Sequence, residues 1–209
     1  MKKFLTVISA LFIVVQTNGQ YEKPMVDEQN KFEYYFNSAF GYYLPINHSK
    51  FLADRGAANA FSFQLNYRSN YFARLYFDMS TVGYHKDNMR IGNVSATLDY
   101  KLNANNVGLD LGYTFPIRKF SPFAYGGTGI SFMDVPGIKN GSQPNEITFG
   151  TKNQSFLQLR GGLGVDYEIS YFFIIYLEGQ YSSTLFKTVL DDRPLQGINL
   201  LIGFKTFLK

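Results

Sequence analysis

Several residue types that mark particular classes of protein are missing or rare in this chain. It has no cysteine and no tryptophan, and only two of its 209 residues are histidine. Without cysteine there is neither a disulfide nor a lipidation site behind a signal peptide. The histidines do not lie at a metal-ligand spacing, and no aspartates cluster as in a calcium loop. We therefore expect no metal and no cofactor.

Net charge and long apolar runs are also scarce. The formal net charge is +4, and it falls to about +2 without Lys2 and Lys3, which is too small to indicate a nucleic-acid partner. No window of 18 residues after Val15 is free of charged or strongly polar side chains. A membrane-spanning helix is therefore not expected, and no 3.6-residue period indicates other helices.

The first residues have the order of a secretory signal peptide. Two lysines precede an apolar run of 12 residues that ends at Val15, and small residues stand at the −3 and −1 positions of a cut before Gln20. The run is too short for a spanning helix. We expect residues 1–19 to be a cleaved signal peptide that directs export through the inner membrane, and residues 20–32 to be a periplasmic lead-in.

Beyond the lead-in, apolar and polar side chains alternate, for example over 61–68 and 157–166. Successive side chains of a strand point to opposite faces, so each segment has one apolar and one polar face. The apolar face is bulky and aromatic, whereas the polar face is rich in Gly, Ser, Asn and scattered charges. This pattern favours a barrel with lipid outside and a polar lumen, and any aromatic girdle must consist of Tyr and Phe.

Eight segments have the length that a tilted membrane strand needs. Their connections alternate between short, as at Ser69–Asn70, and long, as in outer-membrane barrels. We therefore predict an all-β, antiparallel up-and-down transmembrane barrel over 33–209, with short periplasmic turns and long extracellular loops. The predicted strands are 33–44, 59–68, 71–82, 106–116, 122–133, 155–168, 171–184 and 196–208.

The segment 94–102 also alternates like a strand. A ninth strand conflicts with the even number found in bacterial barrels. Either this segment extends the hairpin of strands 71–82 and 106–116 above the membrane, or the barrel has ten strands, with 146–151 as the tenth. We favour eight, because ten strands require a long periplasmic connection. Near 103–106 the apolar residues shift from even-numbered to odd-numbered positions, which indicates a bulge there.

The side chains on the polar face of each strand point into the predicted lumen, and they include charges of both signs. An eight-stranded barrel has an interior just wide enough for side chains to fill, and buried charges must be paired there. We interpret these residues as an ion-pair network that closes the lumen; a proton or small-ion path, or an acid–base pair of Asp166 and Glu178, are alternatives. The predicted network is Glu33, Arg68, Arg74, Asp78, Asp110, Arg160, Asp166 and Glu178.

Catalytic chemistry finds little support in the remaining residues. His48 adjoins Ser49 in one predicted loop. Adjacency in sequence does not by itself place the two side chains together as a catalytic base and nucleophile. The glycines near 126–129 and 161–164 remove side-chain volume in a curved sheet. No Lys-Ser/Thr follows them as in a phosphate-binding loop. We assign no catalytic, cofactor or metal residue.

Two stretches carry a resemblance to a family. Residues 112–129 (GYTFPIRKFSPFAYGGTG) and 163–167 (LGVDY) resemble strands of the small outer-membrane β-barrel domains of Bacteroidota, of the outer-membrane protein A/X type. The resemblance covers roughly 33–209 and departs from the family at the terminal Phe207-Leu208-Lys209. It implies an eight-stranded barrel without catalytic residues, and some relatives serve as accessory parts of secretion or barrel-insertion assemblies.

The sequence thus predicts an integral outer-membrane barrel with a closed lumen and a structural or interaction role. That role would be exercised through surface loops or as an accessory subunit of an outer-membrane assembly. Its expected partners are outer-membrane lipid, lipopolysaccharide and a further outer-membrane protein or assembly. The alternatives are a lipid A-modifying enzyme, a narrow pore, and a soluble periplasmic lipid-carrying barrel.

Overall fold

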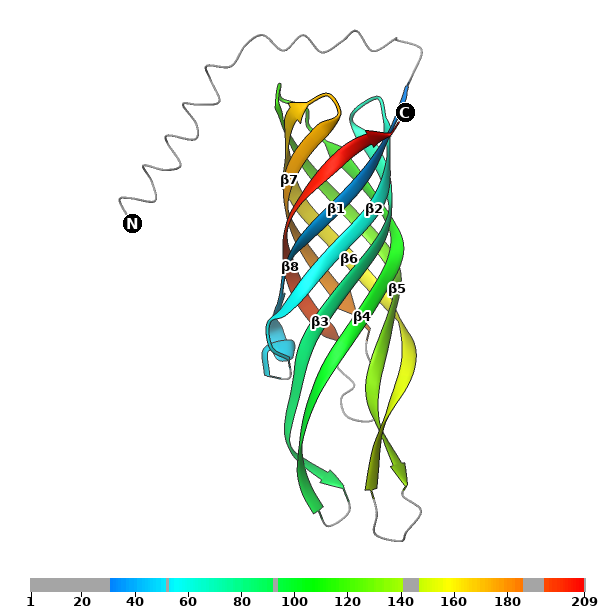
Figure 1. Ribbon diagram of the computed structural model, residues 1–209, viewed down its shortest axis with the longest axis vertical. Helices are drawn as coiled ribbons and strands as arrows, with labels where there is room; N and C mark the ends of the chain where they lie inside the picture. Colours follow the sequence, from blue (N-terminus) through cyan, green and yellow to red (C-terminus); the bar gives the residue numbers. More distant parts are fainter. Residues whose placement is uncertain (1–30, 52, 92–93, 141–146, 186–193, 209) are drawn as a thin grey trace, which may run out of the picture. The chain divides into compact units, whose positions relative to one another are not determined.

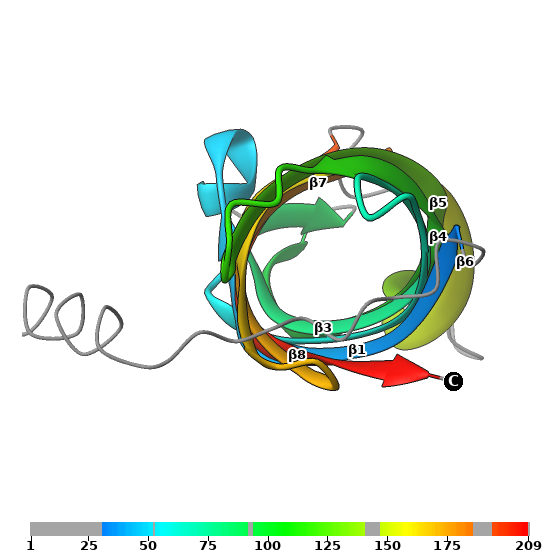
Figure 2. The ribbon, with the colours of Figure 1, turned by 90° about the horizontal axis from the view of Figure 1, so that it is seen from above.

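The structure, a computed structural model, describes residues 31–51, 53–91, 94–140, 147–185 and 194–208. Eight antiparallel strands follow one another around a closed barrel, and β1 pairs with β8 to complete the ring (Figures 1 and 2). The predicted signal peptide and nearly all of the predicted lead-in lie outside the described residues. No helix among the described residues is long and apolar enough to span a membrane.

The strands differ in length, and four of them are much longer than the others. One short 3₁₀ helix, η1 (Asn47–Phe51), lies in the connection after the first strand. The strands are β1 (Phe32–Pro45), β2 (Gly56–Tyr67), β3 (Tyr71–Ile91), β4 (Val94–Thr114), β5 (Phe120–Asn140), β6 (Ile147–Ser170), β7 (Phe173–Thr184) and β8 (Leu195–Leu208).

The prediction of eight strands is confirmed, and the ten-strand alternative is wrong. Residues 94–103 extend β4 and pair with the outer part of β3, so the predicted loop 83–105 is mostly strand. Residues 147–151 belong to β6 and pair with the end of β5. Two tall hairpins, β3–β4 and β5–β6, therefore project beyond the end of the barrel that lies opposite the tight turns, at the bottom of the view in Figure 1.

The exterior of the barrel is covered by large apolar side chains. Leu163, Tyr42 and Phe40 are 71%, 69% and 66% exposed, and similar residues face outward on every strand. At the end that carries the tight turns, aromatic rings meet across neighbouring strands, as in the pairs Phe32–Tyr67 and Tyr71–Tyr113. An apolar outer band bordered by aromatic side chains is the exterior of a membrane barrel, here built without tryptophan.

The interior changes character along the barrel axis. Even-numbered residues of β4 face inward from Asp110 through Asn106 and Ala104 to Leu102, with no register shift over this stretch. The predicted bulge near 103–106 is therefore wrong, because β3 and β4 shift register only between Lys86 and Met89. The apolar residues shift from even-numbered to odd-numbered positions because the surroundings of the strand change. Outside the membrane the apolar side chains point inward and the polar ones face water.

An apolar cluster fills the inside of the barrel at the base of the tall hairpins. It consists of Tyr84, Leu102, Ala104, Met133 and Val135, with Phe156 and Leu195 packed against it. Burial of these side chains stabilises the projecting hairpins in the same way as the core of a soluble sheet. The outward neighbours in β4, such as Lys101 and Asp99, are exposed.

Glycines on the inner wall accommodate the large aromatic rings of the lumen. A Cβ built on Gly162 would lie 2.5 Å from the Tyr125 hydroxyl oxygen, and one on Gly164 would lie 2.2 Å from a Phe123 ring carbon. An aromatic ring that covers a strand glycine is a recognised device for strongly curved sheets. These glycines were predicted to remove side-chain volume, and the reason is that aromatic rings occupy the space where their side chains would lie.

Candidate functional site

The interior of the barrel holds a cluster of buried charges near its middle. Arg74 of β3 donates from Nε to Asp110 Oδ2 at 2.9 Å, and from Nη1 and Nη2 to the Glu178 carboxylate at 3.0 and 3.3 Å. Tyr125 donates its hydroxyl proton to the same Glu178 carboxylate. The guanidinium thus joins β3, β4 and β7, strands that do not all neighbour one another in the sheet.

A second guanidinium extends the cluster toward the tall hairpins. Arg160 of β6 donates from Nε to Asp110 Oδ1 at 2.7 Å and from Nη1 to Asp78 Oδ2. Gln180 also donates to Asp78 Oδ2, at 3.3 Å. Asp110 lies between the two arginines and is fully buried. The result is a continuous set of charge-assisted hydrogen bonds across the lumen.

Aromatic rings cover the cations of the interior. The Arg74 guanidinium carbon lies 4.2 Å from the Tyr125 ring centroid, and that of Arg160 lies 3.2 Å from the Tyr76 centroid. Cation–π contacts of this kind gain strength when the cation is removed from water. They help to retain buried charges that would otherwise cost several kcal/mol each.

A separate ion pair lies nearer the tight-turn end of the barrel. Lys205 Nζ of β8 donates to Asp166 Oδ2 of β6 at 2.7 Å, and lies 4.6 Å from the Phe123 ring centroid. Lys205 is 2% exposed. With the central cluster and the apolar cluster, this pair forms a series of side-chain layers along the lumen.

The structure places seven of the eight predicted network residues on the inner wall. It joins five of them, Arg74, Asp78, Asp110, Arg160 and Glu178, in the central cluster. Asp166 is paired with Lys205 instead, and the buried Glu33 accepts a hydrogen bond from the Tyr35 hydroxyl at 3.1 Å.

The placement of Arg68 in the lumen is wrong. Strand β2 ends at Tyr67, and Arg68 is exposed in the turn that follows, with a positive φ of 51°. The next residue, Ser69, also has a positive φ, of 58°, and Asn70 N donates to Tyr67 O. Two central residues with positive φ define the tight hairpin turn that suits twisted strands. Strand parity does not apply to a residue in such a turn.

Sequence reasoning missed several members of the interior. Lys205 alternates with the outward residues Phe204 and Ile202, so the alternation in the last strand could have predicted that Lys205 faces inward. The inward rings of Tyr76 and Tyr125 gave no such signal, because aromatic residues also cover the outside of the barrel. Only the structure shows that these rings lie over arginines.

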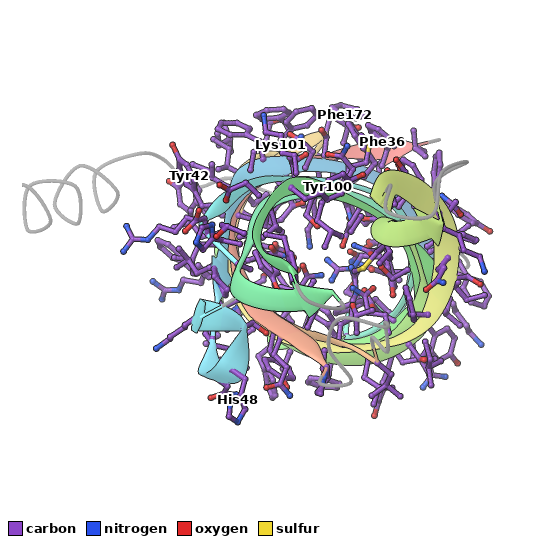
Figure 3. The ribbon with its side chains drawn as sticks, turned by 90° about the horizontal axis from the view of Figure 1, so that it is seen from below. Phe36, Tyr42, His48, Tyr100, Lys101 and Phe172 are labelled. Carbon is purple, nitrogen blue, oxygen red and sulfur yellow. The ribbon has the colours of Figure 1, made fainter. Side chains whose placement is uncertain are left out.

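The two histidines lie outside the lumen. His48 belongs to η1 and projects from the margin of the barrel (Figure 3). Its neighbour Ser49 is buried, and its hydroxyl oxygen accepts a hydrogen bond from Gln196 N at 2.9 Å. His85 contacts Asp99 across the β3–β4 hairpin, a pairing that the sequence did not indicate. Among the described residues, no group of three or more His, Cys, Asp or Glu side chains is arranged to hold a metal.

Comparison with known proteins identifies the architecture. No protein-family model matches the chain, and no curated protein matches its sequence. Neisserial surface protein A is 13% identical, with a TM-score of 0.52, over 84% of this chain and 96% of that chain. OprG from Pseudomonas aeruginosa is 14% identical, with a TM-score of 0.53, over 84% and 95%.

A major outer membrane protein from Thermus thermophilus is similar to the same degree, with 13% identity and a TM-score of 0.53 over 85% of this chain and 99% of that chain. Sequence identity this low carries no information about activity. The chain has the fold of eight-stranded outer-membrane β-barrels.

Proposed function

We propose that the protein is an integral outer-membrane barrel whose closed lumen serves stability rather than transport. Its structural or interaction role is exercised through the surface that it presents outside the membrane. The observation that carries this proposal is the central cluster, in which two arginines and three carboxylates from β3, β4, β6 and β7 join across the lumen. The Bacteroidota family resemblance and the cleaved signal peptide remain predictions.

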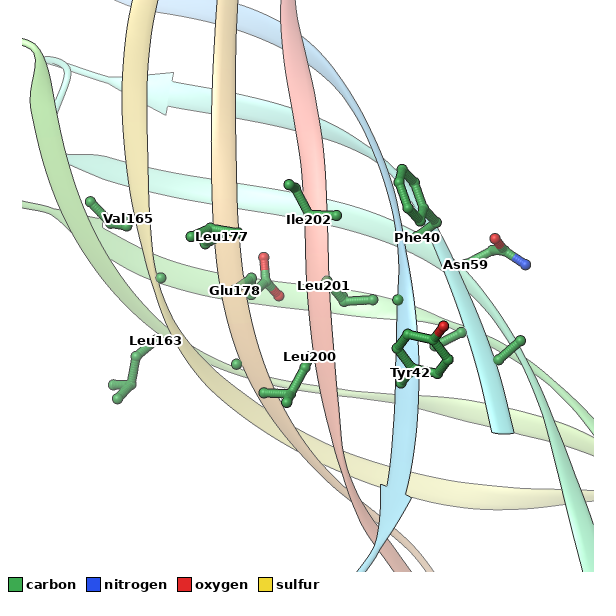
Figure 4. Close-up of a pocket in the computed structure, with 15 residues that line it drawn as sticks. Phe40, Tyr42, Asn59, Leu163, Val165, Leu177, Glu178, Leu200, Leu201 and Ile202 are labelled. Carbon is green, nitrogen blue, oxygen red and sulfur yellow. The ribbon is translucent and has the colours of Figure 1, made fainter. Parts of the chain in front are cut away.

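The apolar exterior supports contact with membrane lipid. In addition to the exposed apolar side chains, a shallow hollow of about 710 Å³ crosses the outer wall over β6, β7, β8, β1 and β2 (Figure 4). Tyr42 and Leu200, which are direct partners across β1 and β8, border it, and Gly179 adds no side chain. A hollow with this lining suits acyl chains, so outer-membrane lipid, including lipopolysaccharide, is the proposed partner on this face.

Membrane integration is tested by fractionation and by mobility on SDS gels. We expect the protein in the detergent-extracted outer-membrane fraction, with a compact band that shifts on boiling. Appearance in the osmotic-shock fluid without detergent would instead support the soluble lipid-carrying barrel.

Orientation is tested by cysteine labelling, for which the cysteine-free chain gives a clean background. Lys152→Cys lies on the exposed face of the β5–β6 hairpin, and Ser69→Cys lies in the turn between β2 and β3. An impermeant maleimide should label Lys152→Cys on intact cells and Ser69→Cys only after permeabilisation. The reverse pattern contradicts extracellular display of the hairpins.

We propose no enzymatic activity for the chain. The Ser49 hydroxyl oxygen already accepts a hydrogen bond from Gln196 N, so Ser49 acts in fixing the η1 connection to β8. A lipid A-modifying enzyme would need an activated nucleophile and a base on the outer surface. His48→Ala should therefore leave the lipid A mass spectrum unchanged, and an altered spectrum would overturn this part of the proposal.

The tall hairpins support a role in interaction. They carry β3, β4, β5 and β6 beyond the level where β7, β8, β1 and β2 end (Figure 1). Loops and projections on a rigid scaffold are the usual sites of recognition. We therefore propose that a partner, such as another outer-membrane protein or assembly, contacts these hairpins. Deletion of the β5–β6 projection should abolish such an association while the barrel still shifts on boiling.

A further inference from the structure

The central cluster has an uneven charge balance. Two arginines, Arg74 and Arg160, face three carboxylates, Asp78, Asp110 and Glu178, which leaves one excess negative charge when all five groups are ionised. Lys205 does not compensate for it, because its amine is paired with a different carboxylate. An unbalanced charge in a closed lumen costs several kcal/mol, so a further positive charge is required nearby or a carboxylate must be protonated.

The excess charge belongs to Asp78. Asp110 accepts hydrogen bonds from both arginines, and Glu178 accepts two from Arg74 and one from Tyr125. Among the described residues, Asp78 accepts one guanidinium hydrogen bond, from Arg160, together with one from the neutral Gln180. It is therefore the least compensated carboxylate of the cluster.

Two further oxygens lie beside Asp78 on the same row of the sheet. Asn106 of β4 is the direct partner of Asp78 of β3, and Ser131 of β5 is the direct partner of Asn106. All three side chains face inward and are 7%, 6% and 0% exposed, respectively. Neighbouring side chains on such a row lie about 4.5–5.5 Å apart at Cβ. Asn106 therefore lies between Asp78 and Ser131, and the three side chains form one continuous inward-facing row.

These oxygens lack partners. Asn106 Oδ1 and Ser131 Oγ are fully enclosed and have no hydrogen-bond partner within the described part of the chain. The next inward residues of the same strands, Ala104 and Met133, belong to the apolar cluster, which separates the row from the tall hairpins. Buried oxygens without donors, next to the least compensated carboxylate of the cluster, form the environment of a cation.

We propose that a monovalent hard cation, sodium, binds between Asp78, Asn106 and Ser131. The ligands are a carboxylate, an amide oxygen and a hydroxyl oxygen, all of the hard type that oxygen-binding cations prefer. A single positive charge neutralises the cluster, whereas a divalent ion reverses its sign. The bound ion satisfies both orphan oxygens and stabilises the folded barrel by binding it in preference to the unfolded chain.

The first test is thermal unfolding of the refolded full chain in detergent micelles. Sodium chloride is compared with N-methyl-D-glucamine chloride at the same ionic strength, which holds general screening constant. We expect the unfolding midpoint to rise by about 5 °C as sodium replaces the bulky cation. Equal midpoints in the two salts overturn the proposal and indicate a protonated Asp78. A response to calcium but not to sodium also overturns it.

Variants locate the site. Because Ser131 Oγ has no hydrogen-bond partner among the residues that the structure describes, Ser131→Ala should match the parent chain in N-methyl-D-glucamine but lose most of the sodium-dependent rise. Ser155→Ala is the matched control: it removes a hydroxyl from the exposed, outward side of the neighbouring strand β6 and should keep the full rise. Asp78→Asn should abolish the rise. An unchanged sodium response in Ser131→Ala contradicts the site even if Asp78→Asn does not fold.

Discussion

At the scale of single residues, Arg160 of β6 joins carboxylates of two other strands in the interior. It contacts Asp78 and Asp110 and lies over the ring of Tyr76. The guanidinium therefore links strands that the sheet itself does not bring into contact. Its ion pairs with two carboxylates and its contacts with the rings of Tyr76 and Tyr125 explain why a buried arginine is retained in a lumen this narrow.

Replacement of this arginine measures the energetic value of the cluster. Arg160→Met should lower the free energy of unfolding by about 3–5 kcal/mol, because it leaves the buried Asp78 without its guanidinium partner and Asp110 with Arg74 alone. Urea unfolding in lipid vesicles, followed by the gel-mobility shift, measures the change. Arg55→Met, which removes an exposed arginine outside the barrel wall, is the control and should change stability little. Equal stability of the two variants contradicts a closed ionic interior.

Strand parity predicts the side of the wall but not the partner across it. It placed Asp110, Arg160 and Glu178 inward, where they lie, because each is in the middle of a regular strand. It placed Arg68 inward too, although the strand ends one residue earlier. Parity also gives no distances across the lumen. The separate pairing of Asp166 with Lys205 therefore required the structure.

At the scale of elements, the pairing of inward rings with inward glycines shapes the wall. Gly162→Ala should destabilise the barrel by about 1–3 kcal/mol, because the new methyl group overlaps the Tyr125 ring. Gly126→Ala is the control, since a Cβ there meets nothing within 4 Å. Both changes remove the same backbone freedom, so the difference between them in urea unfolding isolates the effect of packing. Similar stability of both variants would falsify the packing account.

In the tall hairpins, the alternation of apolar and polar residues indicates a different orientation of the strand faces from that in the membrane. Over 94–103 the alternation is as regular as in the membrane strands, so a strand was predictable but its role was not. At Leu102, an apolar residue of this segment whose side chain is described, the side chain turns inward into the cluster with Met133 and Val135, because water rather than lipid lies outside. A parity change of this kind marks the level at which β4 leaves the membrane.

This change of surroundings gives a prediction for the apolar cluster. Leu102→Asn should loosen the tall hairpins and expose them to proteases, because Leu102 is 2% exposed in the core of that cluster. The barrel below should keep its heat-modifiable mobility. Lys101→Asn, one residue away on the exposed face, is the control and should remain protected. Limited proteolysis of the reconstituted protein compares the two, and equal protection contradicts the role of the cluster.

At the scale of the whole molecule, the interior consists of successive layers. An ion pair at Lys205 lies toward the tight turns, the arginine cluster occupies the middle, and the apolar cluster lies at the base of the hairpins. Strand number and the end with tight turns followed from alternation and connection length. The heights of the hairpins and the apolar cluster could not be predicted from the sequence, because both depend on where lipid gives way to water.

The central claim, a membrane barrel with a closed lumen, is tested most directly by conductance. The refolded protein is inserted into planar bilayers, and insertion is verified by its resistance to unfolding without boiling. We predict no stepwise current under an applied voltage, because charged and apolar layers lie in series along the lumen. Reproducible unitary steps from the unmodified chain would contradict it and would establish a narrow pore.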